Sequence, residues 1–124
     1  MPPTDVILFR EADGSVPLLD WLDSLPAKAR ARCVQRLDLL EEHGHELRRP
    51  HVEYLEGTDL YELRIKVFRV NYRILYFFHG REAAVVSHGF GKEGAIPPGE
   101  IALATERMGR FKADPERHSF RGDG

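Results

Sequence analysis

The segment "SHGFGK" places an imidazole, an aromatic ring and an ammonium at alternate positions, His88, Phe90 and Lys92. Alternate side chains of an extended strand point to the same face, so these three would share one side of a sheet. An imidazole transfers protons near neutral pH, an aromatic ring can stack on a base, and an ammonium binds phosphate as a point charge. These residue types suit a ligand that contains both phosphate and bases.

Arginines in the two preceding segments extend this set of cations. Arg64 and Lys66 alternate in "YELRIK", and Arg73 lies in "VNYRILYFF". If the connecting turns are symmetric, Arg64 lies opposite Arg73 and Arg73 opposite His88, in one row across three strands. Like charges directly opposite one another destabilise a sheet. An anion on the row would offset this repulsion, and phosphate fits because a guanidinium fork matches its oxygens.

Structural explanations of the same residues remain open at this point. Cations on the solvent face of a sheet often only keep a protein soluble, and a one-residue change of register would break the row. For Arg73 the alternative is a structural salt bridge to Glu62. For His88 it is a hydrogen bond to the backbone.

The hydrophobic pattern predicts the elements that must position these residues. In chain order we expect a strand in "DVILFRE", helices in "GSVPLLDWLDSL" and "AKARARCVQRLDLLEEHG", a short strand in "HVEYL", strands in "LYELRIK", "VNYRILYFF" and "EAAVVSHGFG", and a helix in "PPGEIALATERMGRF". This order predicts an α+β fold, a small antiparallel or mixed sheet with an N-terminal helical hairpin and a C-terminal helix packed on one face. Residues 1–111 would form one domain and residues 112–124 a flexible tail.

Period-two alternation assigns the faces of the three central strands. One set of alternate residues is mostly apolar and is expected beneath the helices: Tyr61, Leu63 and Ile65, then Tyr72, Ile74, Tyr76 and Phe78, then Ala83, Val85 and Ser87. The other set contains the cations, His88 and Phe90, and is expected to form the open face of the sheet.

Composition limits the class of protein. The 124 residues are 42% hydrophobic and 31% charged, with a net charge of -2, which indicates a globular domain with local charge clusters. The single Cys33 excludes an intrachain disulfide. No segment approaches 18 apolar residues, and the first residues lack the profile of a signal peptide, so we expect a cytoplasmic protein without membrane contact. The histidines of "HGHELRRPH" lack partners for zinc, and we expect no metal and no cofactor.

The order of the motifs resembles a known family. The segment "LYELRIKVFRVNYRILYFF", followed by "VVSHGFGKEGAIPPGEIALATERM", is similar to toxins of bacterial type II toxin–antitoxin systems in the RelE/ParE superfamily. The similarity is greatest to the phage-derived, HigB-like branch, in which "L(W/Y)ELR", "YRILY" and "HGF.K" precede "P..EI..A..R". It extends from about Val6 to Phe111.

The resemblance implies a small α+β toxin that cleaves mRNA, usually in the ribosomal A site, and so inhibits translation. It implies the ribosome and mRNA as partners and a helix-turn-helix antitoxin as the neutralising partner. The toxin–antitoxin complex would bind operator DNA through the antitoxin. We expect the antitoxin to bind the helices, through exposed parts of "LLDWLDSL" or "EIALATERMGRF", and to leave the basic face partly open.

The expected site combines the family motifs with the chemistry of RNA cleavage. The 2′-hydroxyl of the RNA is the nucleophile, so the protein must accept a proton, stabilise the charged phosphorane and protonate the leaving oxygen, without a metal. The expected catalytic residues are Arg64, Arg73, His88 and Lys92, and the expected RNA-binding residues are Lys66, Arg69 and Phe90. Two positions depart from the pattern: Glu93 stands where a second basic residue is common, and Glu62 where other members can carry a lysine.

Two other functions stay open. A toxin of the same fold could bind DNA gyrase without cleaving RNA, although a basic face with a histidine suits RNA better. A module that has lost its activity could bind a protein partner through its helices, and Glu93 favours that alternative.

Overall fold

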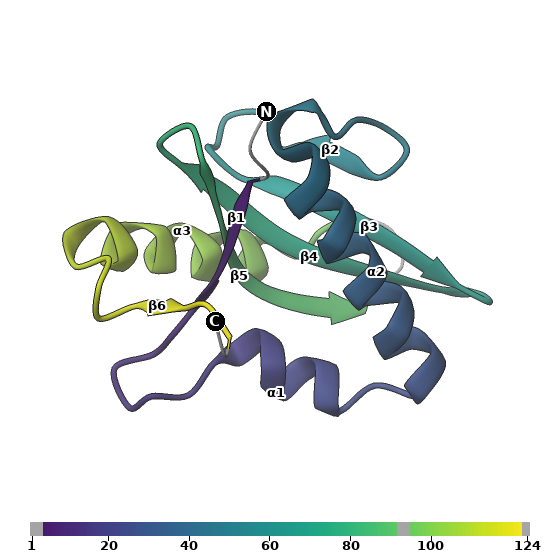
Figure 1. Ribbon diagram of the computed structural model, residues 1–124. Helices are drawn as coiled ribbons and strands as arrows, with labels where there is room; N and C mark the ends of the chain where they lie inside the picture. Colours follow the sequence, from purple (N-terminus) through teal and green to yellow (C-terminus); the bar gives the residue numbers. More distant parts are fainter. Residues whose placement is uncertain (1–3, 92–94, 123–124) are drawn as a thin grey trace.

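The computed structural model describes residues 4–91 and 95–122. Its elements are β1 (Asp5–Phe9), α1 (Pro17–Asp23), α2 (Ala27–His43), the short 3-10 helix η1 (Gly44–Glu46), β2 (Val52–Tyr54), β3 (Tyr61–Val67), β4 (Val70–His79), β5 (Ala83–Gly91), α3 (Pro98–Ala113) and β6 (Ser119–Phe120) (Figure 1). The described strands form one sheet in the order β2-β3-β4-β5-β1-β6. Neighbouring strands are antiparallel except β1 and β5, which are parallel. The predicted α+β class is confirmed.

The helix α2 shows how local sequence sets an element. Ala29, Cys33 and Leu40 are buried at helical spacing and face the sheet. The helix ends at Gly44, whose backbone N–H donates to the carbonyl of Leu40 and whose φ is 52°. A positive φ favours glycine, because other residues are strained there. The predicted end of this helix is therefore confirmed.

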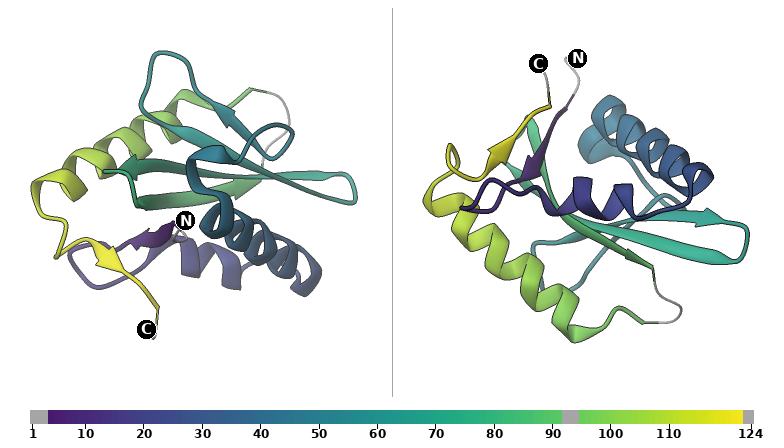
Figure 2. Two further views of the ribbon diagram at one scale, coloured as in Figure 1. Left: turned by 45° about the horizontal axis from the view of Figure 1, so that its top comes forward. Right: turned by 90° about the horizontal axis from the view of Figure 1, so that it is seen from below.

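The helices cover both faces of the sheet, as the two views of Figure 2 show. The helices α1 and α2 pack on the face that contains Leu63, Ile65, Ile74 and Tyr76. The helix α3 packs on the opposite face, against Leu75, Phe77 and Val85. The expectation that all helices pack on one face is wrong for α3. Four consecutive residues of β4, from Ile74 to Phe77, are buried, and such a run requires cover on both faces.

The close approach of α1 to the sheet depends on one glycine. A Cβ atom added at Gly89 would lie 2.3 Å from the ring of Trp21. Trp21 also makes an edge contact with Tyr72, with ring centroids 6.0 Å apart. Trp21 is therefore a packing residue that joins α1 to β4 and β5.

The segment that follows α3 is ordered into the fold, which corrects the predicted flexible tail as far as the structure describes it. Ser119 and Phe120 pair with the edge of β1. The ring of His118 is buried and stacks on Phe9, with centroids 5.0 Å apart. The imidazole Nδ1 also lies 2.8 Å from the carbonyl oxygen of Arg10. This pairing covers an edge that would otherwise expose unpaired backbone groups.

The register between β4 and β5 differs from the symmetric pairing that the sequence suggested. His79 pairs with Ala83, so the turn between them has three residues instead of two. Tyr76 pairs with Val86 but Leu75 pairs with His88, which leaves Ser87 as the extra residue of a β-bulge. The first shift moves Val85 to the α3 face, contrary to expectation. The two shifts together return His88 to its predicted face, displaced along β4 by two residues.

Candidate anion-binding site at the edge of the sheet

Two rows of paired residues cross β3, β4 and β5 on the face that carries α3. Arg64 pairs with Arg73 as predicted, but the residue opposite Arg73 on β5 is Phe90. His88 instead continues the neighbouring row, which begins with Glu62 and Leu75. The expected row of two arginines and a histidine is therefore wrong in its third member, because of the turn and the bulge.

A buried carboxylate accounts for the adjacent arginines. The residue Glu62 is only 1% exposed. Its Oε1 atom lies 2.5 Å from Nε of Arg64 and 3.8 Å from Nε of Arg73. The salt bridge between Arg73 and Glu62, which was the structural alternative for Arg73, is thus present, but its two atoms are as far apart as 3.8 Å. One negative charge lies beside two positive charges, so the group of three keeps an excess of one positive charge.

The guanidinium of Arg73 has unused hydrogen-bonding capacity. Its contact with Glu62 at 3.8 Å is too long for a hydrogen bond, and among the described residues it makes no other ion pair or side-chain hydrogen bond. The side chain is 14% exposed, whereas that of Arg64 is 48% exposed. A guanidinium has five N–H donors in a planar fork. Arg73 therefore offers a largely shielded set of donors to a ligand.

Arg73 lines a pocket of about 450 Å³ at the edge of β3. The pocket is lined by Arg36, Pro50, His51, Arg64, Ile65, Lys66, Asn71, Tyr72 and Arg73. It forms because β2 pairs only with Tyr61 to Leu63, so the edge of β3 beyond Leu63 has no neighbouring strand. We call this site the basic pocket. It brings together three of the predicted residues, Arg64, Lys66 and Arg73.

Arg36 closes the basic pocket from the side of α2. Its guanidinium donates a hydrogen bond to the backbone carbonyl of Arg64, and the N–H of Arg64 donates to the carbonyl of His51, 2.8 Å away. Burial, together with the nearby positive charge of Arg32, lowers the pKa of Arg36. An arginine remains charged despite such a shift. In the described part of the chain no carboxylate pairs with Arg36, so its charge adds to that of the pocket.

The histidine and the phenylalanine of "SHGF" lie beneath α3. The side chain of His88 is 9% exposed; its Nε2 lies 3.4 Å from Oε1 of Glu100 and its Nδ1 lies 2.8 Å from Oγ of Ser87. Burial and the charge of Arg107 lower the pKa of His88, although Glu100 partly opposes them. Phe90 belongs to the core beneath α3. The expectation of an exposed His88 and an open stacking ring at Phe90 is wrong.

Two of the remaining predicted residues, Lys66 and Arg69, differ in their relation to the pocket. Lys66 is exposed and lines it, whereas Arg69 is exposed in the turn between β3 and β4 and does not. Lys92, and with it Glu93, lies outside the described residues.

Arg36, His51 and Asn71 line the pocket but were not predicted as site residues from the sequence. Arg36 had a usable signal, because Lys28, Arg32 and Arg36 recur at four-residue spacing and form a basic stripe on α2. Asn71 also had a signal, because it alternates with Arg73 and pairs with Lys66 in the same hairpin. His51 had none, because it reaches the pocket through the pairing of distant segments.

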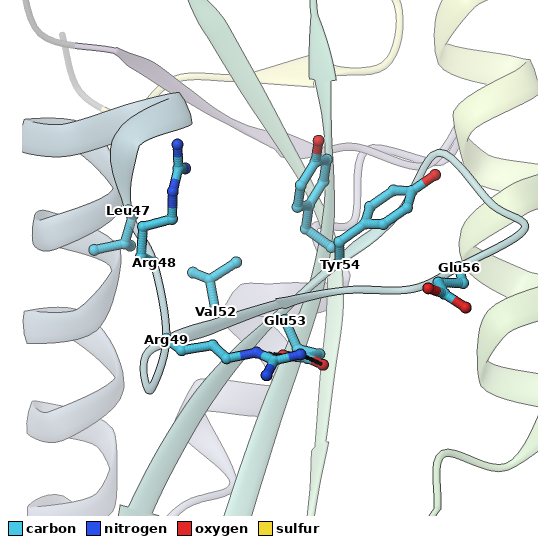
Figure 3. A pocket seen from close by; sticks show the side chains of 8 residues that line it. Leu47, Arg48, Arg49, Val52, Glu53, Tyr54 and Glu56 are labelled. Carbon is cyan, nitrogen blue, oxygen red and sulfur yellow. Dashed lines mark hydrogen bonds and ion pairs between the residues drawn. The ribbon is translucent and has the colours of Figure 1, made fainter.

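A second pocket, of about 330 Å³, lies around β2 and shows the contrast with paired charges (Figure 3). There Arg49 donates from Nε and Nη2 to the two carboxylate oxygens of Glu53, over 2.5 and 2.6 Å. This arginine is already satisfied by a carboxylate.

Within residues 4–91 and 95–122, no group of three or more His, Cys, Asp or Glu side chains is arranged to hold a metal ion. None of the helices in those ranges has the length and apolar character needed to cross a membrane.

The fold and the pocket define a small α+β protein with a cationic pocket at an open sheet edge. Residues 20–109 match the model of the family described as Phage derived protein Gp49-like (DUF891). The match spans more than half of the 124 residues, and the chain belongs to this family. The phage-derived part of the expected relationship is thereby confirmed. No curated protein sequence shows significant similarity to the chain.

Proposed function

We propose that this protein is the toxin of a type II toxin–antitoxin system in the RelE/ParE superfamily, and that it cleaves mRNA on the ribosome. The observation that carries the proposal is the basic pocket, in which Arg73 keeps its donors unused while the buried Glu62 balances only one of two arginines. Membership of the phage-derived Gp49-like family supports it. A phosphodiester is an anion with oxygens that match such donors.

The proposed reaction uses the nucleophile of the RNA itself. The 2′-oxygen attacks the adjacent phosphorus, its proton passes to a base, and the bond from phosphorus to the 5′-oxygen breaks. The leaving 5′-oxygen takes up a proton, which gives a 2′,3′-cyclic phosphate and a 5′-hydroxyl. Arg73 and Arg64 would stabilise the extra negative charge of the phosphorane. Arg36 and Lys66 would hold the neighbouring phosphates.

Two histidines are candidates for the proton transfer. His88 was the expected group, but its two ring nitrogens face Ser87 and Glu100 beneath α3. His51 lines the basic pocket together with both arginines, and histidine is the side chain most suited to proton transfer near neutral pH. We therefore assign the transfer to His51. Single-turnover cleavage by His51→Gln and His88→Gln proteins separates the two, since only the variant that lacks the catalytic imidazole loses rate at saturating ribosome concentration.

The antitoxin is proposed to bind the helices and not the pocket. Asp20, Asp23 and Glu106 are exposed on α1 and α3, which suits a mixed polar and apolar contact rather than an acidic peptide. Hydrogen exchange on the complex tests this arrangement. New protection confined to β3, β4 and β5, with none in the helices, would contradict it.

Expression of the protein in growing bacteria tests the function. We expect translation to stop, and mapped RNA ends to fall within codons of translated messages. Purified ribosomes with mRNA should show the same cuts, and RNA without ribosomes should show far fewer. Induction of DNA damage with intact mRNA would instead support the gyrase alternative. Growth without either effect would indicate a binding module without activity.

A further inference from the structure

An aromatic side chain projects from the tip of the hairpin that joins β3 and β4. Phe68 is 78% exposed, the highest fraction among the exposed large apolar residues in the described part of the chain. The hairpin reaches one extremity of the molecule in Figures 1 and 2. Phe68 and Arg69 form the two-residue turn that follows the pair Val67 and Val70.

The backbone at Phe68 is unfavourable for its residue type. Its φ is 56°, and it is the one non-glycine residue with a positive φ in the described ranges. Two-residue hairpin turns need such angles, and glycine, asparagine or aspartate supply them at low cost. A bulky residue at positive φ is an outlier. Neither the turn nor burial accounts for a phenylalanine here, and strain of this kind is concentrated at functional sites.

The surroundings of Phe68 are cationic. The ammonium of Lys28 lies over its ring, 4.5 Å from the centroid, and Arg69 follows in the same turn. Lys66, two residues earlier on β3, lines the basic pocket. Two residues of chain span at most about 7 Å, so the backbone of Phe68 lies close to that of Lys66. The ring therefore lies within reach of a base attached next to a phosphate that is held in the pocket.

We propose that Phe68 is a stacking platform for a base of single-stranded RNA whose backbone occupies the basic pocket. The inference rests on the proposed function. It assigns to Phe68 the stacking role that was expected for Phe90. An exposed aromatic ring among cations suits single-stranded nucleic acid, because stacking on a π-face tolerates any base while the cations hold the phosphates. Cation–π contact with Lys28 orients the ring before RNA binds.

Binding of a labelled oligoribonucleotide with 2′-methoxy groups, which cannot be cleaved, tests the inference on the intact protein. Phe68→Leu keeps apolar bulk but removes the ring, and we expect its affinity to fall roughly 5- to 100-fold. Phe68→Gly should lose a similar factor while its Tm stays equal or rises, because glycine relieves the positive φ. Phe68→Trp should retain affinity, and RNA should quench its fluorescence by more than that of wild type, which contains only Trp21.

Tyr54→Leu is the matched control, since Tyr54 is another exposed aromatic residue, on β2 and away from the turn. Its affinity should equal that of wild type. Equal affinity of Phe68→Leu and wild type would overturn the inference and leave the proposed function intact. If Phe68→Leu kept the affinity of wild type but no longer arrested growth, the inference would also be overturned. That result would indicate that the ring of Phe68 contacts a protein and not RNA. Failure of the proposed function is recognised by a different measurement: expression of the wild-type protein in growing bacteria would leave mRNA intact.

Discussion

Glu11 and Glu62 each lie between two arginines, but their carboxylate oxygens contact these arginines differently. Glu11 uses both oxygens: Oε1 lies 2.7 Å from Nη1 of Arg110, and Oε2 lies 3.1 Å from Nη2 of Arg107. The guanidinium groups of Arg107 and Arg110 also lie over the ring of Phe9, 5.6 and 5.2 Å from its centroid, respectively. This cluster joins α3 to the segment that follows β1.

Glu62 is more deeply buried, yet it accepts only one hydrogen bond from its arginines in the described structure, whereas Glu11 accepts three. Only its Oε1 contacts them, closely to Arg64 and distantly to Arg73. Around Glu11 a second carboxylate, Glu106, pairs with Arg110 over 3.1 Å. Around Glu62 the additional neighbours in the basic pocket are cations instead.

The comparison teaches that residue types alone do not separate a structural anchor from a candidate binding site. Both clusters contain arginine and glutamate. In the Glu11 cluster the positive and negative charges balance, although Nε and Nη1 of Arg107 and Nε of Arg110 are buried without a hydrogen-bond partner among the described residues. In the Glu62 cluster positive charge is in excess and Arg73 lines an accessible pocket, so an external anion would complete the arrangement that we propose.

The largest expected effect is on catalysis, at Arg73. We expect Arg73→Ala to fold normally and to lose roughly 10²–10³ in the single-turnover rate of mRNA cleavage, the usual cost of one lost contact to the transition state. Arg110→Ala is the matched control, because it removes an arginine from the cluster that anchors α3. Its rate per folded molecule should equal that of wild type. A folded Arg73→Ala protein that cleaves at the wild-type rate would remove the distinction between the clusters.

The next effect is on stability, at Glu11. Glu11→Ala should lower the free energy of unfolding by roughly 1–3 kcal/mol, because it leaves the shielded Arg107 without its carboxylate. Thermal unfolding would show a Tm lower by roughly 5–10 °C. Glu106→Ala, at a side chain that is mostly exposed, should change stability by less than about 1 kcal/mol.

Glu11 also affects how the free energy of unfolding depends on pH in the acidic range. Hydrogen bonding to Arg110 lowers the pKa of Glu11 from its ordinary 4.5, which burial partly opposes, and Arg107 adds to the lowering. Its stabilisation is complete above pH 4.5 and is lost as the pH falls through the lower folded value. Denaturant unfolding of wild type and Glu11→Ala should therefore converge below pH 4.5. Parallel curves at all pH values would contradict the anchoring role.

A weaker pH dependence is expected from His88. Because burial and Arg107 lower its pKa in the folded state from the ordinary 6.5, the unfolded chain binds a proton first. The free energy of unfolding should fall as the pH drops below 6.5, by at most about 1.4 kcal/mol per pH unit. His88→Gln should flatten this limb between pH 6.5 and the folded pKa. An unchanged slope would mean that His88 is not held neutral beneath α3.

The smallest effect is expected at Lys66. Lys66→Ala should weaken RNA binding modestly and reduce the slope of log affinity against log salt by about 1, because one phosphate contact fewer is made. Lys112→Ala removes an exposed cation at the end of α3, and its salt slope should equal that of wild type. Equal slopes for both variants would place the RNA backbone outside the basic pocket.

Most of the secondary structure followed from the sequence, because its signals are local. Helical spacing of apolar residues and a glycine stop defined α2, and β-rich runs broken by turn residues defined β3, β4 and β5. The pairing of Arg64 with Arg73 was also predictable, because a two-residue turn joins their strands. These features depend on neighbours in the chain.

The tertiary structure alone decided the composition of the site. The three-residue turn and the bulge at Ser87 moved His88 by two residues along β4, and α3 covered the face that was expected to stay open. Arg36 and His51 reach the basic pocket from segments that are distant in the sequence. Register and helix placement minimise the energy of the whole core, to which many distant residues contribute. The local sequence pattern therefore indicated the arginines of the candidate site, but only the packed fold determined which of them has donors that make no hydrogen bond within the described part of the protein.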